Sequence, residues 1–445
     1  MGGTMMEKLA RGQYITHGSA AYHDAFMVFK ANMDDLKALC ARHNIPVMLS
    51  SQVSNLRGQP PFISDDPEST TPEHRASFDA ALHRAMSFLG EGNTASALEG
   101  FRFALTIDSL HAGAHYLMAR CLDSLGRKNE ALIEYMKARD DDRLRFRMSS
   151  DFNNLVRTEC DRPTVMFVDI EHLFQDHSPD GIVGNELIVE HLHPNSRGYF
   201  LMAKEYARVL REHEYIASSE EWSRRDTIGD DILWSNRNLT DIDEIIAKRR
   251  TEILTSGWPF HDQTPTVDPV PENDTLGHIA EQVTRALWTW DRAHTEAADY
   301  YLGRGETDKA IREYRTIVNM IPVGVAIHLK LARLYLQEKN YEATRLQLLA
   351  SLDVEKTILA YRALADIYMN MSHPKEAAGF YEKTFTFEQT PPERVDNGYL
   401  LALAYARANM LDKAATQLLQ VLSIKPDYQP AVNLLNDIRS VRQSR

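Results

Sequence analysis

A spacing of about 34 residues between similar triplets is the feature that most restricts what this chain can fold into. In the C-terminal third, a small residue is followed three positions later by a tyrosine and twelve positions later by another small residue. Each such unit has an apolar face that it cannot bury alone, so the period predicts helix pairs that stack in a solenoid. The four triplets are Ala298, Tyr301 and Ala310; Ala332, Tyr335 and Thr344; Ala365, Tyr368 and Ala377; and Ala402, Tyr405 and Ala414.

The same spacing recurs in a shorter array nearer the N-terminus, with Gly92 and Gly126 at the expected turns. Both arrays resemble tetratricopeptide repeats, with two repeats in the first array, four in the second and a capping helix over residues 430–441. The resemblance implies that the concave face of the second array binds a protein or a peptide. The triplets of the first array are Ala85, Phe88 and Ala97, and Ala119, Leu122 and Ala131.

Two stretches outside the arrays each combine a helix with a short apolar strand. A helix over residues 20–41 precedes a strand at 45–50, and a helix over 152–160 precedes a strand at 164–169. Helix followed by apolar strand, twice, is typical of a parallel α/β sheet. Two strands cannot bury both faces of a parallel sheet. We therefore expect an exposed apolar edge that a missing N-terminal segment or a second copy of the chain would cover. The residues expected at this edge are Val47, Met48, Val165 and Phe167.

A short acidic and histidine-rich block stands immediately before a predicted helix at 196–212. Glu190 lies three positions before His193, and Pro194 and Gly198 follow. A carboxylate that orients a histidine makes up two-thirds of a serine-hydrolase triad, but no Gly-Asp-Ser or Gly-x-Ser-x-Gly turn precedes this block. The alternatives are a helix-start motif with polar surface residues, or part of a metal site whose other ligands would have to come from elsewhere.

Outside the first array, residues 20–212 resemble the SGNH (GDSL-like) hydrolase family, in the variant with an inserted pair of tetratricopeptide repeats and a tetratricopeptide tail. The last block of that family has Asp-x-x-His-Pro and then a glycine. Glu190, His193, Pro194 and Gly198 match it, with Glu in place of Asp. The serine, glycine and asparagine blocks at the front of the family have no counterpart in this sequence. Upstream matches are Pro46 to Leu49, Ser54 to Arg57, Pro61 to Ser64, Ala138 to Arg147 and Phe167 to Asp169.

This resemblance implies a serine-type esterase or O-acyltransferase that is inactive alone, because its nucleophile block is missing. His193 would be the general base and Glu190 its orienting carboxylate. Asn55, Arg145 and Arg147 are candidate substrate-binding residues, although Asn55 also suits a structural role and arginines beside Asp140–Asp142 suit local ion pairs. The alternative function is a non-catalytic tetratricopeptide scaffold for protein–protein interaction that carries a degenerate hydrolase remnant.

The expected architecture is mostly α-helical with an α/β part: an incomplete SGNH-like α/β/α domain, interrupted by a repeat pair and followed by a helical solenoid. A stretch that holds every tryptophan of the chain should bridge the α/β part and the second array. The expected segments are 1–72, the first SGNH-like part; 73–148, the repeat pair; 149–214, the second SGNH-like part; 215–292, the bridge; and 293–445, the solenoid and its cap.

Charge and composition exclude several classes of partner. The formal net charge is −13 and no basic patch is concentrated anywhere, which argues against a nucleic-acid partner. No run of eighteen apolar residues predicts a membrane span. The three cysteines are widely spaced and predict neither a metal site nor a redox pair. We expect no cofactor and no bound metal, and a cytoplasmic location by default.

Overall fold

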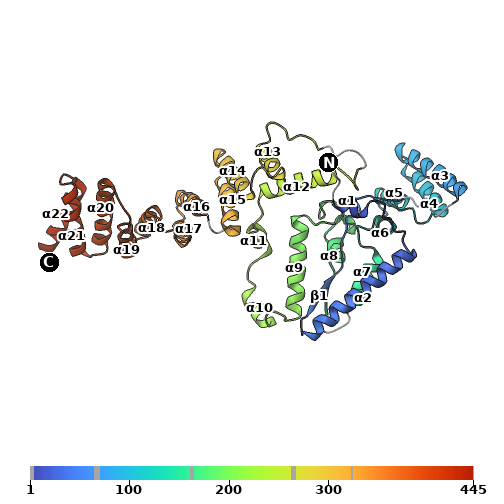
Figure 1. The fold of residues 1–445 in the computed structure, drawn as a ribbon, viewed down its shortest axis with the longest axis horizontal. Helices are drawn as coiled ribbons and strands as arrows, with labels where there is room; N and C mark the ends of the chain where they lie inside the picture. Colours follow the sequence, from blue (N-terminus) through green and yellow to red (C-terminus); the bar gives the residue numbers. More distant parts are fainter. Residues whose placement is uncertain (1–4, 65–70, 161–164, 262–266, 322–323, 444–445) are drawn as a thin grey trace. The chain divides into compact units, whose positions relative to one another are not determined.

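The computed structural model describes residues 5–64, 71–160, 165–261, 267–321 and 324–443. In these residues the chain is mostly α-helical, with one pair of β-strands (Figure 1). The predicted strand start at Thr164, the predicted turn at Pro322 and the connector residues 262–266 lie outside the described part. The chain divides into two compact units. Unit 1 comprises residues 1–236 and 251–268, and unit 2 comprises residues 237–250 and 269–445.

Unit 1 places a repeat pair between two α/β segments. Its last short helices, α10 and α11, lie in the predicted bridge. Of the helices described in either unit, none has the length and apolar character that crossing a bilayer requires. The elements in chain order are α1 (Met5–Ala10), α2 (Ala20–Arg42), β1 (Val47–Ser50), α3 (Pro72–Gly90), α4 (Thr94–Ile107), α5 (Ala112–Ser124), α6 (Lys128–Asp140), α7 (Ser150–Thr158), β2 (Val165–Val168), α8 (Ile170–Asp176), the 3₁₀ turn η1 (Pro179–Gly181), α9 (Ser196–Glu212), α10 (Ser219–Arg225) and α11 (Asp230–Ser235).

The two strands pair in parallel, as the sequence predicts. Val47 lies opposite Val165, and Ser50 lies opposite Val168. Helix α7 contacts β1, and α9 contacts β2. The core beside the sheet is formed by apolar residues from β2, α8, the loop before α9 and α9 itself. Its buried members are Val53, Met166, Val168, Ile170, Phe174, Val183, Leu187, Ile188, Leu201 and Val209.

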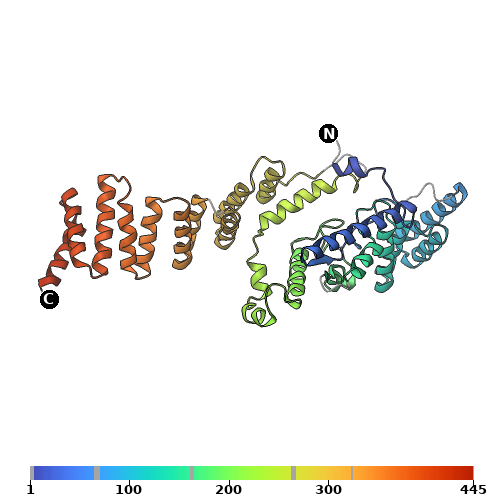
Figure 2. The same cartoon turned by 60° about the horizontal axis from the view of Figure 1, so that its bottom comes forward.

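The exposed apolar surface does not lie where the sequence predicts it. Val165 is only 6% exposed, and the residues of β1 are half-buried. The exposed apolar side chains are instead on α2 and in the turn before β1. Helix α2 lies beside α7 (Figures 1 and 2), and Phe26 and Phe29 pack on Phe152 with ring centroids 5.2 Å apart. Outside these contacts, α2 and the turn after it keep large apolar side chains exposed. The exposed residues are Met27, Val28, Leu36, Leu39 and Ile45.

Small residues bring the helices of the inserted pair close together. A Cβ atom added to Gly100 on α4 would lie 2.7 Å from the Cβ of Ala85 on α3, which leaves room only for glycine. Gly92 and Gly126 both have φ of +76°, a conformation that costs glycine nothing. The predicted turns are therefore confirmed. Ala85, Ala97, Ala119 and Ala131 are all fully buried.

From α13 to α22, unit 2 is a row of antiparallel helices in which each helix contacts its neighbours in the chain (Figure 2). The predicted close-contact residues Ala298, Ala332, Ala365 and Ala402 are at most 3% exposed, and no strand interrupts the described residues of 293–443. The helices are α12 (Asp241–Thr255), which crosses the division, α13 (Thr275–Thr284), α14 (Trp290–Gly303), α15 (Thr307–Met320), α16 (Val325–Gln337), α17 (Tyr341–Val354), α18 (Ile358–Asn370), α19 (Pro374–Thr384), α20 (Pro391–Arg407), α21 (Leu411–Ile424) and α22 (Gln429–Gln443).

The turn inside each helix pair uses one residue with positive φ. Gly305 occupies this position in the first pair, with φ of +75°. In the next three pairs the position is taken by Lys339, Ser372 and Asn409, with φ of 59°, 64° and 59°. A non-glycine residue there costs roughly 1–2 kcal/mol. The turn is therefore kept by the packing of the helices and not by the residue at its corner.

A buried polar network fastens the start of unit 2. His294 on α14 has no exposed surface and lies between two carboxylates, 2.6 Å from Glu313 on α15 and 3.1 Å from Asp243 on α12. Thr240 donates to Glu313 at 2.8 Å, and the Trp290 indole donates to Asp243 at 2.8 Å. Although burial opposes the charge, the hydrogen bonds to Asp243 and Glu313 raise the pKa of His294 to about 9.

We predict that His294→Ala lowers the unfolding free energy of unit 2 by roughly 3 kcal/mol at pH 7, since it leaves two buried carboxylates without their cation. Because the pKa of His294 is raised on folding, its protonated imidazole stabilises the fold fully at pH values below the ordinary pKa of 6.5. This contribution is lost as pH rises through about 9. Urea unfolding from pH 6 to 10 should therefore show a loss of stability that the variant lacks. His373→Ala, at an exposed histidine of the same unit, is the matched control. An unchanged alkaline slope in His294→Ala would contradict the assignment.

Candidate functional site

The Glu190–His193 block lies on a short loop that closes on itself before α9. Val189 donates its backbone N–H to His193 at 2.8 Å, and Asn195 donates to Leu187 at 2.9 Å. The Asn195 side chain then caps α9 by accepting from Gly198 at 3.0 Å. A Cβ on Gly198 would lie 2.6 Å from the Leu187 carbonyl oxygen, so the tight turn requires glycine there. The local sequence therefore fixes the direction in which His193 leaves the loop.

Glu190 is the buried centre of this block. Its carboxylate accepts from the His193 Nδ1 atom and from the backbone N–H groups of His191 and Leu192, the latter at 3.0 Å. Burial opposes ionisation, but the hydrogen bonds from His191 and its neighbours outweigh it and lower the pKa of Glu190 to about 2. The side chain of His193 is 59% exposed. The predicted carboxylate–imidazole hydrogen bond is therefore present, with a charged carboxylate behind an accessible ring.

Asn55 ties this block to the segment that follows β1. Its amide donates to the Glu190 carbonyl at 2.8 Å and to Asn185 at 2.6 Å, while its oxygen accepts from Gly58 at 2.7 Å. Its backbone N–H donates to the His191 carbonyl at 3.0 Å. The structure thus brings Asn55 and Glu190 together, as their pairing as site residues requires. Because the amide is engaged by the protein, substrate binding by Asn55 stays a prediction.

An aromatic enclosure surrounds His191, the neighbour of the predicted base. The ring centroids of Phe62 and Phe260 both lie 5.5 Å from that of His191, and Phe146 lies at 6.0 Å. Trp258 packs on Phe146 at 6.0 Å. Trp258 and Phe260 were not predicted as site residues, since both lie in the predicted bridge. Aromatic residues on both sides of Pro259 were the signal that this connector packs on the block.

The serines at the end of β1 serve structural hydrogen bonds. Ser50 accepts from the Tyr206 hydroxyl of α9 at 2.9 Å. Ser51 donates to Asp169 at 3.0 Å and accepts from the backbone of Glu171 at 2.9 Å. In the described part of the chain no serine hydroxyl bonds to the His193 ring, whose partner is Glu190. A nucleophile for a triad is thus not assembled by these residues.

Fixed ion pairs occupy the end of α6 and the loop that follows it. Arg139 is fully buried and donates to Asp140 at 2.9 Å, to Glu171 on α8 at 3.1 Å and to Ser150 on α7 at 2.7 Å. One guanidinium therefore joins three helices. The pairing of Arg139 with an adjacent aspartate confirms the local ion pair considered from the sequence.

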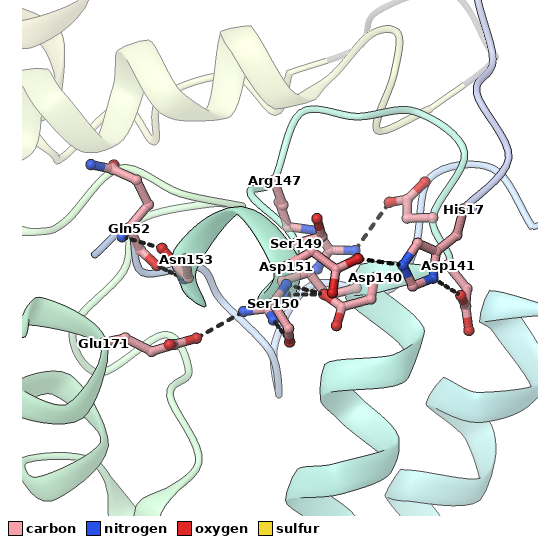
Figure 3. Close-up of polar contacts among 12 residues, drawn as sticks. His17, Gln52, Asp140, Asp141, Arg147, Ser149, Ser150, Asp151, Asn153 and Glu171 are labelled. Atoms are coloured by element: carbon pink, nitrogen blue, oxygen red, sulfur yellow. Dashed lines mark hydrogen bonds and ion pairs between the residues drawn. The ribbon is translucent and has the colours of Figure 1, made fainter. Parts of the chain in front are cut away.

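The next two aspartates find cationic partners of their own. His17 bonds to Asp141 at 2.8 Å, and this hydrogen bond raises the pKa of His17 (Figure 3). Arg147, whose side chain is 2% exposed, donates to Asp142 at 3.1 Å. Arg145 instead donates to backbone carbonyls. Substrate binding by Arg145 and Arg147 stays a prediction.

The described residues of this block do not assemble a set of metal ligands. Among the residues that the structure describes, no group of three or more His, Cys, Asp or Glu side chains is placed to hold a metal ion. His191 and His193 share the single carboxylate of Glu190. The arrangement can orient a base and hold a charge, and that is the chemistry available to the block.

Comparison with known proteins identifies the repeats. A tetratricopeptide repeat profile matches residues 82–142 and 295–354, so both arrays contain tetratricopeptide repeats. The tetratricopeptide repeat protein 21 homolog of Caenorhabditis briggsae is 31% identical over 121 residues, which is 25% of this chain and 9% of that relative. The chain thus spans under a tenth of the curated relative. The predicted SGNH-like segments at 1–72 and 149–214 lie outside both profile matches and have no support from these relatives.

Solved structures with helical repeats also resemble parts of the chain. A crystal structure of MamA protein is 21% identical and covers 34% of this chain and 82% of its own, with a TM-score of 0.31. A tetratricopeptide repeat protein from Parabacteroides merdae is 13% identical and covers 82% of this chain and 99% of its own, with a TM-score of 0.24.

We predict that Glu190→Gln lowers the unfolding free energy of unit 1 by roughly 2 kcal/mol at pH 7. The lowered pKa contributes stability above the ordinary value of 4.5, and this contribution is lost as pH falls through about 2. The difference between the two proteins should therefore shrink as pH falls below 4.5, which denaturant titrations at several pH values can measure. Glu220→Gln on the exposed start of α10 is the control. A difference that grows on acidification would refute the prediction.

Proposed function

We propose that this protein is an interaction scaffold whose second tetratricopeptide array binds a peptide or helix of a partner protein. The observation that carries the proposal is that unit 2 uses one set of residues for helix stacking and leaves the rest of its helix surface exposed. Repeated small residues and tyrosines, such as Ala365 and Tyr301, are buried by helix stacking. The remaining helix surface is left to solvent over several consecutive pairs, and stacked repeats of this kind present extended binding surfaces.

Exposed leucines on both helix rows of the solenoid supply apolar anchors for such a partner. Leu359 on α18 is 61% exposed and Leu419 on α21 is 54% exposed, although both belong to helices that are otherwise packed. Apolar anchors surrounded by polar residues are the usual centres of peptide binding. Because the two leucines lie on the first and second helix of their pairs, they distinguish the two rows experimentally.

Peptide display against the full-length protein should enrich a shared motif, and hydrogen exchange with a selected peptide should show protection along one helix row between residues 290 and 424. We expect either Leu359→Glu or Leu419→Glu, but not both, to weaken that peptide by about tenfold. The unaffected variant serves as the control for folding. Selection without enrichment, or protection confined to unit 1, would argue against the scaffold.

A second candidate function rests on the Glu190–His193 pair. A buried, ionised carboxylate behind an accessible imidazole is the arrangement that prepares a general base. The parallel strand pair and this block support an SGNH-like ester hydrolase or O-acyltransferase. Since the described serines do not reach His193, the nucleophile would have to come from a partner polypeptide or a second copy.

This second candidate predicts that the chain alone does not turn over short acyl esters. Purified protein and His193→Ala should hydrolyse an aryl acetate at the same slow rate, with no burst, because a lone imidazole without a nucleophile gives only background hydrolysis. Turnover that disappears in His193→Ala and in an alanine variant of Ser50, Ser51 or Ser54 would show that this chain holds its own nucleophile.

A further inference from the structure

A cavity of about 520 Å³ lies in unit 1 between α2, the segment after β1 and the loop that precedes α7. Its volume is in the range that encloses small-molecule ligands. The cavity is not part of the repeat arrays, and the scaffold proposed above does not use it. Its walls are predominantly apolar and include two arginines. The apolar lining residues include Ala25, Phe29, Val53, Phe146, Phe152 and Leu192.

Arg145 brings an incompletely paired cation to this wall. Its Nε donates to the Ile15 carbonyl at 2.9 Å and one terminal nitrogen donates to the Asp140 carbonyl. The other terminal nitrogen is buried and has no hydrogen-bond partner in the described structure. The guanidinium lies 5.0 Å from the centre of the Tyr22 ring, which also lines the cavity. Leaving a buried, charged N–H group without an acceptor costs free energy, and a ligand that supplies an acceptor would remove this cost.

Arg147 supplies a second donor of the same kind. Its terminal nitrogens bond to the carbonyls of Asn55 and Gln59 and to the Asp142 carboxylate, while its Nε is buried and has no partner among the described residues. Two guanidinium N–H groups of residues that line the cavity thus lack acceptors, and because both nitrogens are buried, a ligand oxygen reaches them only after a small shift of the lining side chains. Charge-assisted hydrogen bonds to a carboxylate would satisfy both.

The neighbouring acids restrict the charge of that ligand. Asp140 ends α6 and Asp141 and Asp142 follow it directly, and each of the three already pairs with a cation or an imidazole. They lower the positive potential around Arg145, so a dianionic phosphate would be repelled more strongly than a singly charged carboxylate. The phenyl rings on the other walls suit a hydrocarbon body.

We propose that this cavity binds an amphiphilic monocarboxylate, whose carboxylate accepts hydrogen bonds from Arg145 and Arg147 and whose aliphatic or aromatic body lies among the phenylalanines. The site goes beyond the scaffold function and is independent of it, because the peptide would bind in unit 2. The shared chemistry covers two sources, a medium-chain fatty acid and an aryl carboxylic acid.

Isothermal titration of the full-length protein with octanoate and with 2-naphthoate tests the proposal and separates the two sources. We expect at least one acid to bind at least about tenfold more tightly than its neutral methyl ester, because the ester cannot form the charge-assisted pair. Equal affinity for acid and ester would overturn the proposal. So would the absence of binding by either acid at millimolar concentration.

Three variants localise the binding. Arg145→Gln should weaken the acid by about tenfold or more and leave the ester unchanged. Ala25→Trp, at an exposed position of α2 on the cavity wall, should fill the cavity and weaken acid and ester alike. Arg143→Gln is the matched control, since Arg143 is close in sequence but outside the lining. Should Arg145→Gln fail to fold, Ala25→Trp still decides, because unchanged binding in that variant contradicts the site.

Discussion

Close contact between helix backbones at alanine and glycine is the interaction on which most of this structure depends. Where Gly100 meets Ala85, there is no space for a further methyl group. The same small-residue contact recurs at Ala298 and its equivalents throughout unit 2. Stacking of this kind buries the apolar faces of the helices against one another. Contacts between each array and the segments that are not repeats therefore depend on polar and charged groups.

Those junctions are made by buried charge. Arg139 joins α6, α7 and α8, and the aspartates that follow it fix the loop on which Arg145 and Arg147 stand. A buried charge is tolerated only when its partners are in place, so this loop has little freedom. That rigidity fixes two arginines that line the cavity, each with one buried guanidinium N–H group that finds no acceptor in the described protein.

The sequence predicts the regular parts of this molecule well, because periodicity reports local packing. The 34-residue spacing locates both arrays, and the bounds predicted for α9 agree with the structure. The Glu190–His193 contact could also be predicted from the sequence, since residues three positions apart in a tight turn can face one another. The packing of Trp258 and Phe260 around His191, and the burial of β2, could not be predicted from the sequence. Both depend on contacts between distant segments, which no local pattern records.

A histidine and an acceptor nineteen positions later face one another in both arrays, as His115 with Glu134 and His294 with Glu313. The interior pair His328 and Gln347 keeps the geometry at 2.9 Å but has exchanged the carboxylate for a neutral amide. Of the two pairs in unit 2, the charged one is in α14–α15, where Asp243 of α12 adds a second carboxylate. A copy of α14–α15 made by gene duplication would keep Glu313 but leave Asp243 behind, so its buried histidine would lose one of its two counter-ions.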